Sequence, residues 1–240
     1  MLEIQHLSKT YKGGKKAVCD LTLSVQAGDI CGFIGHNGAG KTTTLKCITG
    51  ITRFESGEIL VDGHSVRTEP IQCKSMMAYI PDNPDLYEYL TGIQYLNFIA
   101  DIFAVTAAQR EERISKYATA FQLTEVLGDL ISSYSHGMKQ KLAIISALVH
   151  APKLLILDEP FVGLDPAASV TLKKIMHELC QAGGAVFFST HVLDVAEKLC
   201  NKIAIIQNGK LFASGDTHTL TGGASLESVF MEVVNHVQAD

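Results

Sequence analysis

The eight residues from Gly35 to Thr42 constrain the fold of this chain more than any other segment. They read Gly-His-Asn-Gly-Ala-Gly-Lys-Thr and fit the pattern G-x-x-x-x-G-K-[ST]. Glycines let the backbone curve closely around phosphates, and the N–H groups at the start of a following helix attract anions. In such a loop the lysine, Lys41, reaches the β- and γ-phosphates, and the Thr42 hydroxyl ligates Mg²⁺. The residues predicted to bind the nucleotide here are Gly35, Asn37, Gly38, Ala39, Gly40, Lys41, Thr42 and Thr43.

Short apolar segments alternate with helical patterns along most of the chain, which predicts an α/β fold. Residues 30–34, before the glycine-rich loop, are uniformly apolar, as in a strand buried on both faces. A helix is expected from Lys41 towards Thr49, and alternating residues at 21–25 indicate an earlier strand. We therefore predict a P-loop NTPase core, with a mixed sheet, an N-terminal antiparallel part and an inserted α-helical subdomain.

The middle of the chain has a different pattern, with apolar residues at helical spacing between 84 and 150. Further helices are expected at 109–121, 138–150 and 167–181, and further strands at 154–157, 185–188, 203–206 and 211–213, the last two joined by Asn208-Gly209. We predict a single ATPase domain over residues 1–222. Its α/β core covers 1–83 and 151–222, its helical subdomain covers 84–150, and a short tail covers 223–240.

Two acidic residues, Asp158 and Glu159, follow the apolar run Leu154-Leu155-Ile156-Leu157. Acids at the end of a buried strand carry a high desolvation cost unless cations accompany them. Beside a phosphate-binding loop, Asp158 is suited to hold Mg²⁺ through a water, and Glu159 is suited to accept a proton from an attacking water. An exposed acidic pair at a strand end is the competing interpretation, and the buried strand disfavours it.

Composition and charge exclude several classes of protein. The 240 residues are 47% hydrophobic and 19% charged, proportions typical of a folded globular protein. A formal net charge of −5 gives no electrostatic reason to expect nucleic acid as the main partner. Apolar runs are far shorter than the roughly 20 residues of a membrane span, and the N-terminus is unlike a secretion signal. We therefore expect a cytoplasmic protein.

Five motifs in a fixed order resemble those of the ATP-binding subunits of ABC transporters. They are the glycine-rich loop, Tyr134-Ser135-His136-Gly137-Met138, Asp158-Glu159, Gly163-Leu164-Asp165 and Ser189-Thr190-His191. The second is similar to the family signature Leu-Ser-Gly-Gly-Gln, which other P-loop proteins lack. In that family the signature of one subunit completes the ATP site of another. The resemblance therefore implies that Ser135 and the Gly137 N–H contact the γ-phosphate of ATP held by a second chain.

Other positions carry family roles by the same resemblance. Tyr11 matches the aromatic residue that stacks on adenine, and the alternative is an ordinary aromatic residue at a strand end. Asp165 matches a residue of the dimer interface. His191 matches the histidine that contacts the γ-phosphate, and together with Glu159 it is expected to be catalytic.

Two departures from the family pattern affect the predicted site. Asp82 follows Tyr79-Ile80-Pro81 where the family usually has Gln, which senses Mg²⁺ and the attacking water. A carboxylate also binds Mg²⁺, but it is shorter, charged and unable to donate a hydrogen bond. Asp82 is therefore either a third metal residue beside Thr42 and Asp158 or a solvated loop acid. The signature also departs, with Tyr134, His136 and Met138 in place of Leu, Gly and Gln.

The motif variants are similar to those of ABC-2-type exporters, particularly the Ecs-type bacterial ATPases. They include Asp82-Asn83-Pro84-Asp85-Leu86-Tyr87, and residues 226–230 resemble the short C-terminal segment of export ATPases. This resemblance implies an exporter subunit on the inner face of the cell membrane, with ATP and Mg²⁺ as cofactors. Its partners would be a transmembrane permease and a second ATPase subunit, either another copy or a related chain. The region around Leu86, Tyr87, Tyr89 and Tyr95 is a candidate docking surface, unless these residues are simply core or loop.

Three other classes of protein compete with this interpretation. A non-transport ABC ATPase of the translation or DNA-repair type would share the motifs, but the second cassette, coiled coils or zinc-binding cysteines typical of those types are not found. A P-loop kinase or GTPase would lack the signature. A regulatory scaffold would not need Glu159 and His191.

Overall fold

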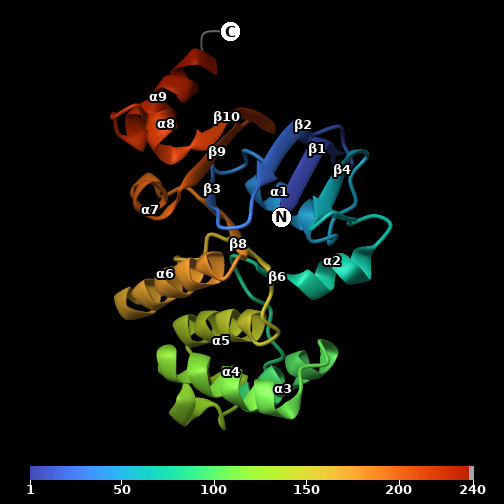
Figure 1. The fold of residues 1–240 in the computed structure, drawn as a ribbon, viewed down its shortest axis with the longest axis vertical. Helices are drawn as coiled ribbons and strands as arrows, with labels where there is room; N and C mark the ends of the chain where they lie inside the picture. Colours follow the sequence, from blue (N-terminus) through green and yellow to red (C-terminus); the bar gives the residue numbers. More distant parts are fainter. Residues whose placement is uncertain (238–240) are drawn as a thin grey trace.

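The computed structural model describes the chain from Met1 to Val237 and contains two sheets (Figure 1). The larger sheet has six strands in the order β10-β9-β3-β8-β7-β6. Every neighbouring pair in it is parallel except β9 and β10, which form the predicted hairpin at Asn208-Gly209. Its strands are β3 (Ile30–Ile34), β6 (Met77–Ile80), β7 (Leu154–Asp158), β8 (Ala185–Thr190), β9 (Lys202–Gln207) and β10 (Lys210–Asp216).

The smaller sheet is antiparallel and is built mostly from the first part of the chain. Its four strands lie in the order β2-β1-β4-β5. They are β1 (Leu2–Thr10), β2 (Lys16–Val25), β4 (Ser56–Val61) and β5 (His64–Ser65). The predicted fold class, an α/β core with a mixed sheet and an N-terminal antiparallel part, is confirmed.

Alternating side chains of the central strands divide the interior into two apolar cores. Phe33, Ile156 and Phe187 lie in the core that contains α1 (Lys41–Ile48) and the antiparallel sheet. Their neighbours in the chain, such as Leu157, point to the opposite face, where the helices pack. Each face of the central strands is covered by one of these cores, so the side chains on both faces are apolar. This explains the uniform apolar runs in the sequence.

The inserted helices lie together at one end of the molecule, with α5 nearest the large sheet (Figure 1). Hydrogen-bonding side chains fix where each begins. Thr91 and Gln94 form a capping box, and Thr106 and Ser135 accept hydrogen bonds from the first turns of the next two helices. These caps start two helices two residues earlier than predicted. The elements are α3 (Gly92–Ile102), α4 (Ala107–Ala120), α5 (His136–Leu148) and the 3-10 turns η1 (Thr124–Val126) and η2 (Ile131–Ser133).

The remaining helices connect the strands or follow the last of them. α6 begins at Pro166 because Asp165 caps it, and proline suits the first helical position. Leu226, inside the predicted tail, is buried, and its N–H donates to Glu197 of α7 at 2.9 Å. The domain boundaries thus remain a proposal. These helices are α2 (Pro70–Met76), α6 (Pro166–Gln181), α7 (Leu193–Leu199), α8 (Thr217–Thr221) and α9 (Leu226–Val237), of which only α6 was predicted from the sequence as a helix.

Between Met1 and Val237, every helix is too short or too polar to cross a bilayer.

Candidate active site

Four loops that carry predicted site residues meet at one edge of the large sheet. They follow β3, β6, β7 and β8, and the carboxyl ends of parallel strands share an edge. A cavity of about 260 Å³ opens there. It is lined by Tyr11, Lys15, Ala17, His36, Asn37, Gly38, Gly40, Lys41, Thr42, Thr43, Asp82, Asp158 and Glu159. A larger cavity, of about 540 Å³, lies between Met1, α4 and the end of α6 and is lined by none of the motif residues.

Glycines give the loop before α1 its shape. Gly38 and Gly40 have φ angles of 82° and 111°, in the left-handed region that side chains disfavour. A Cβ atom at Gly40 would also lie 2.4 Å from the Ala17 carbonyl oxygen. Gly40 is the N-cap of α1 and has no side chain to accept from the first N–H groups. Those donors are therefore available to an anion.

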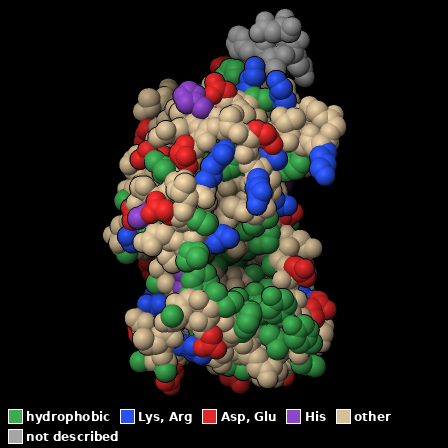
Figure 2. All heavy atoms as spheres, turned by 90° about the vertical axis from the view of Figure 1, so that its right-hand side faces the viewer, with side chains coloured by type: hydrophobic (Ala, Val, Ile, Leu, Met, Phe, Trp, Pro, Cys, Tyr) green, Lys and Arg blue, Asp and Glu red, His purple; other side chains and the backbone are tan. Residues whose placement is uncertain are grey.

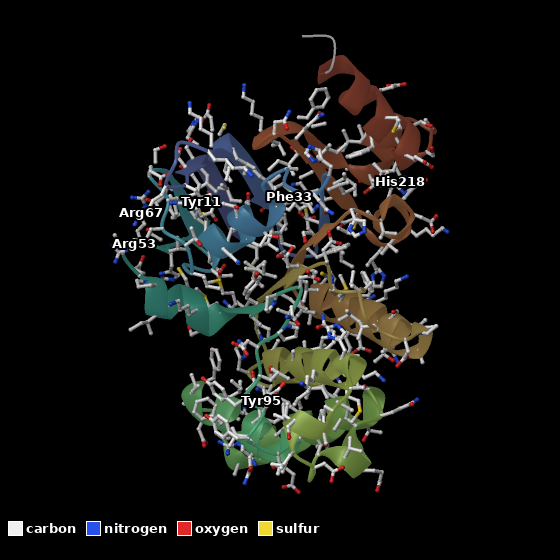
Figure 3. The ribbon with its side chains drawn as sticks, turned by 180° about the vertical axis from the view of Figure 1, so that it is seen from behind. Tyr11, Phe33, Arg53, Arg67, Tyr95 and His218 are labelled. Atoms are coloured by element: carbon white, nitrogen blue, oxygen red, sulfur yellow. The ribbon has the colours of Figure 1, made fainter. Side chains whose placement is uncertain are left out.

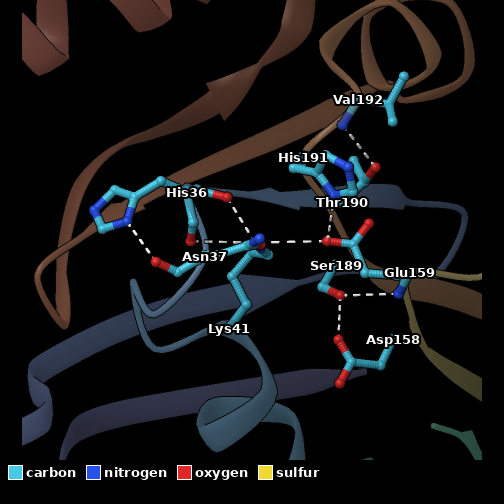
Figure 4. Close-up of polar contacts among 10 residues, drawn as sticks. His36, Asn37, Lys41, Asp158, Glu159, Ser189, Thr190, His191 and Val192 are labelled. Carbon is cyan, nitrogen blue, oxygen red and sulfur yellow. Dashed lines mark hydrogen bonds and ion pairs between the residues drawn. The ribbon is translucent and has the colours of Figure 1, made fainter. Parts of the chain in front are cut away.

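Lys41 lies inside the curve of this loop and is only 6% exposed. Its Nζ atom donates to the Gly35 carbonyl at 2.6 Å and to the His36 carbonyl at 3.3 Å. The same atom is 3.5 Å from Glu159 Oε1 (Figure 4). The ammonium group thus stands between the phosphate-binding loop and the acidic strand end, so phosphates bound in the loop would meet a fixed positive charge.

The two acids at the end of β7 differ in their surroundings. Asp158 is 2% exposed and accepts a hydrogen bond from the Ser189 hydroxyl. Glu159 has a φ angle of 48°, and its Oε1 atom is 3.0 Å from His191 Nδ1. Its second carboxylate oxygen, Oε2, is buried without a protein partner. Glu159 therefore has an oxygen free to accept a proton or a hydrogen bond from a bound group.

Tyr11 and Asp82 lie at the margins of the cavity. Tyr11 directly follows β1, is 42% exposed, and its hydroxyl is 3.3 Å from Thr43 Oγ1. Asp82 is an exposed residue of the loop after β6. Burial, and then the charges of Asp158 and Asp82, raise the pKa of Tyr79. Both acids also line the cavity.

The signature residues stand apart from this cavity. Ser135 is exposed and caps α5, where its Oγ accepts from the Met138 N–H at 3.3 Å. Ser135 and Gly137 do not line the cavity. The His136 ring packs against Gly163, where an added Cβ atom would lie 2.7 Å from His136 Cδ2. A single chain thus does not bring its signature and its phosphate-binding loop into one pocket.

One departure in the signature has a structural explanation, and one ion pair holds this region to the next helix. Tyr134 is buried, and its hydroxyl donates to the Val126 carbonyl, so the tyrosine is accommodated without an unpaired polar atom. Lys141 Nζ is 2.7 Å from Asp165 Oδ2. The Lys141 hydrogen bond, helped by the Ala168 N–H, lowers the pKa of Asp165. Asp165 thereby links α5 to the start of α6 within the chain.

The sequence analysis missed several cavity residues. Lys15 and Ala17 line the cavity, but their neighbours in the sequence give no sign of it. His36 also lines it, and its place between Gly35 and Asn37 in the glycine-rich loop would have indicated this. Ser189, which does not line the cavity, was quoted in a family motif but given no role of its own, although it is a polar residue that directly follows the apolar Phe187-Phe188. That break in an apolar strand is a usable signal, and the register places Ser189 opposite Asp158.

Comparison with known proteins identifies the family. The sequence model of the family described as ABC transporter matches residues 18–162, which include the loop at Gly35 and both acids. The chain belongs to the ABC transporter family. It is an ATP-binding ATPase subunit of that family.

Three ABC proteins illustrate the similarity. A solved structure described as the ATP binding subunit of an ABC transporter is 35% identical, with a TM-score of 0.94, over 98% of this chain and 99% of that one. The "ABC-type transporter ATP-binding protein EcsA" of Bacillus subtilis is 34% identical over 89% of each chain. The "Probable multidrug ABC transporter ATP-binding protein YbhF" of Escherichia coli is 34% identical over 92% of this chain and 38% of its own length.

Proposed function

We propose that this ABC ATPase works as half of a pair, in which two chains close head to tail around two Mg-ATP molecules. The observation that supports this most directly is the separation of two motifs. Ser135 and Gly137 lie outside the P-loop cavity, at the start of α5. A helix N-terminus favours an anion, so it suits the γ-phosphate of ATP held by another chain. Asp165, which is exposed beside α5, is the proposed dimer contact.

ATP would then stabilise the closed pair, because it contacts both chains only in that state. A ligand shifts an equilibrium by the difference between its affinities for the two states. The second chain is either another copy of this one or a related chain. Both would present an equivalent signature surface.

Hydrolysis would use residues already in contact. Glu159, with its unpartnered Oε2, is the proposed base that accepts a proton from the attacking water. His191 is 3.0 Å from the other oxygen of Glu159 and is proposed to contact the γ-phosphate. Lys41 would offset negative charge on the transferred phosphoryl group. Loss of the γ-phosphate would remove contacts that hold the pair closed.

The cavity has the oxygen ligands that a Mg²⁺ site beside phosphates requires. Thr42, Asp158 and Asp82 all line it, and hydroxyl and carboxylate oxygens are ligands that this hard cation prefers. Within residues 1–237, no cluster of three or more His, Cys, Asp or Glu side chains forms a complete metal cage. Mg²⁺ is commonly held by one or two carboxylates together with phosphates and waters. When bound, it would offset charge on the β- and γ-phosphates.

An aromatic patch on the helical subdomain is the proposed docking surface for a transmembrane permease. We define the patch as Tyr87, Tyr89, Tyr95 and Phe98. The ring centroids of the last three lie 5.6 to 6.0 Å from the ring centroid of Tyr87. Tyr87, Tyr89 and Phe98 are 44%, 75% and 40% exposed. Leu86, which the sequence analysis included, is 6% exposed and belongs to the core instead.

The surroundings of the aromatic patch also suit a protein partner. On the face of the molecule drawn in Figure 2, hydrophobic side chains gather beside a hollow in the lower half, where the helical subdomain lies. Figure 3 shows that Tyr95 lies in this subdomain, far from Tyr11 on the sheets. Tyr95 also lines a groove of about 340 Å³, together with Ile51, Met77, Ile99 and Phe103. Exposed apolar surface of this kind is typical of interaction sites.

The proposed transport direction is export, with the chain on the inner face of the cell membrane. The name of YbhF refers to multidrug transport, and EcsA is named as an ABC-type transporter protein. The motif variants around Asp82 and Ser135 resemble those of ABC-2-type exporters. The names of these relatives describe transporters and do not favour a translation or DNA-repair role.

The paired mechanism is tested by measuring Mg-ATP turnover per chain over a wide range of protein concentration. If two chains form each active site, turnover per chain rises with concentration and then levels off. Light scattering identifies the protein concentrations at which only monomers are present. If turnover per chain stays constant down to those concentrations, the proposal is wrong.

A further inference from the structure

Ser189 is a fully buried polar residue at the carboxyl end of β8. β8 lies between β3, which leads into the P-loop, and β7, which ends in the acids. The register places Ser189 between Phe33 and Asp158 on the neighbouring strands. A hydroxyl in such an apolar position is costly unless it is hydrogen bonded. The partners of Ser189 therefore indicate what it does.

Both acidic residues are partners of Ser189 (Figure 4). Its Oγ donates a hydrogen bond to Asp158 Oδ1. The same Oγ accepts from the Glu159 N–H at 3.1 Å, and the Ser189 carbonyl accepts from that N–H at 3.2 Å. One side chain thus contacts the carboxylate of the first acid and the backbone of the second.

The backbone of Glu159 is in a conformation that needs such support. Its φ angle of 48° lies in the left-handed region, which is uncommon for residues other than glycine. The shared N–H contact ties this residue to the end of β8. In this conformation the Glu159 carboxylate reaches both His191, at 3.0 Å, and Lys41, at 3.5 Å.

We propose that Ser189 is a positioning residue for ATP hydrolysis, which orients the metal-facing carboxylate of Asp158 and the backbone of Glu159 with one hydroxyl. By donating to Oδ1, it leaves Asp158 Oδ2 to face Mg²⁺ or a water bound to Mg²⁺. By accepting from the Glu159 N–H, it fixes the direction in which the proposed base points. This inference rests on the proposed hydrolytic role of both acids.

The alternative is that Ser189 only fills space at the strand end. Ser189→Thr and Ser189→Val separate these roles, because the two new side chains have nearly the same volume and only threonine has a hydroxyl. Ser189→Ala removes the hydroxyl without adding volume. Thermal unfolding of all three variants shows which of them fold.

The first measurement is the affinity for a non-hydrolysable ATP analogue, with Mg²⁺ and with EDTA. If Ser189 orients Asp158, Ser189→Ala weakens binding with Mg²⁺ by about 10-fold or more, the usual effect of losing a hydrogen bond behind a metal ligand. Binding in EDTA, which depends on Lys41 and the loop, stays at the wild-type level. Equal affinity of wild type and Ser189→Ala for the Mg²⁺ complex would overturn the metal part of the proposal.

The second measurement is turnover at saturating Mg-ATP. Ser189→Ala and Ser189→Val are expected to lower kcat by about 10- to 100-fold, and Ser189→Thr is expected to recover most of it. Equal kcat values for the threonine and valine variants would show that the hydroxyl is not used. If the wild-type chain has no turnover, the proposed function is contradicted. The role of Ser189 in orienting Asp158 would still be decided by the binding measurement.

Discussion

The Nδ1 atom of His191 lies 3.0 Å from Oε1 of Glu159. This contact joins the loop after β8 to the end of β7. The same carboxylate oxygen is 3.5 Å from Lys41 Nζ. Three residues from separate parts of the chain therefore meet around one oxygen atom. Because the other oxygen, Oε2, is without a protein partner, Glu159 is both held in place and able to accept a proton.

His191→Ala is expected to lower kcat by about 100-fold or more, because it removes the contact to Glu159 and the proposed contact to the γ-phosphate. Affinity for ADP, which lacks that phosphate, should be unchanged. Steady-state turnover and equilibrium ADP binding check the two parts. His218→Ala is the matched control, since His218 is exposed on α8 and distant from the site (Figure 3). Wild-type turnover in His191→Ala would exclude a catalytic role.

Asp82→Ala is expected to raise the Mg²⁺ concentration for half-maximal turnover by about 10-fold if this carboxylate is a metal ligand or binds a ligand water. Asp85→Ala changes an exposed acid of the same loop that does not line the cavity, so it should not affect the Mg²⁺ requirement. A Mg²⁺ titration of ATPase activity compares the two variants. Identical Mg²⁺ curves for both would show that Asp82 is a solvated loop acid.

Tyr89→Asp is expected to abolish recovery of a membrane protein with the tagged chain from detergent-solubilised native membranes. Tyr89 is 75% exposed in the aromatic patch, and burying a new charge there against an apolar partner is costly. ATPase turnover of the isolated chain should stay at the wild-type level. Phe212→Asp, on the exposed face of β10, is the matched control. Normal recovery with Tyr89→Asp would place the docking surface elsewhere.

Acid is expected to destabilise the chain through His150. Burial lowers the pKa of His150 from 6.5 to about 4, the charge of Arg113 adds to this shift, and a hydrogen bond to the Met77 carbonyl opposes it. The unfolded chain therefore takes up this proton at a higher pH than the folded chain does. As a result, the free energy of unfolding falls as pH falls from 6.5 to 4. A shift of this size corresponds to about 3 kcal/mol.

Urea unfolding at several pH values checks this effect, with His150→Gln as the comparison. Glutamine retains an N–H donor for the Met77 carbonyl and does not titrate. The variant should therefore lose less stability than wild type between neutral and acid pH. Parallel pH profiles for the two chains would mean that His150 does not contribute.

Local patterns in the sequence were sufficient for the P-loop, the acidic strand end and the α/β fold, because each depends on neighbours within a few residues. The glycines at 35–40 and the apolar run before Asp158 are of this kind. Helix α2 was missed because it has only seven residues and one buried side chain, Cys73, so its apolar periodicity is weak.

Contacts between distant segments could not be read from the sequence in the same way. The cavity position of Lys15 and the contact of Ser189 with Asp158 depend on strand order and register. The burial of Leu86 next to the exposed Tyr87 depends on tertiary packing. The separation of Ser135 from the P-loop cavity was implied only by the family resemblance, because the position of α5 relative to the cavity depends on the fold.

The most direct test of the paired site measures the particle mass in solution of the Glu159→Gln variant in the presence of Mg-ATP. Loss of the base should lower turnover by about 100- to 10,000-fold while ATP still binds, so closed pairs accumulate at twice the chain mass of 26.0 kDa. Adding Ser135→Arg should leave the protein at 26.0 kDa with its ATP affinity intact, because the new side chain blocks only the surface facing the second chain. An ATP-dependent dimer that persists in the double variant, or loss of ATP binding by its monomer, would contradict this account.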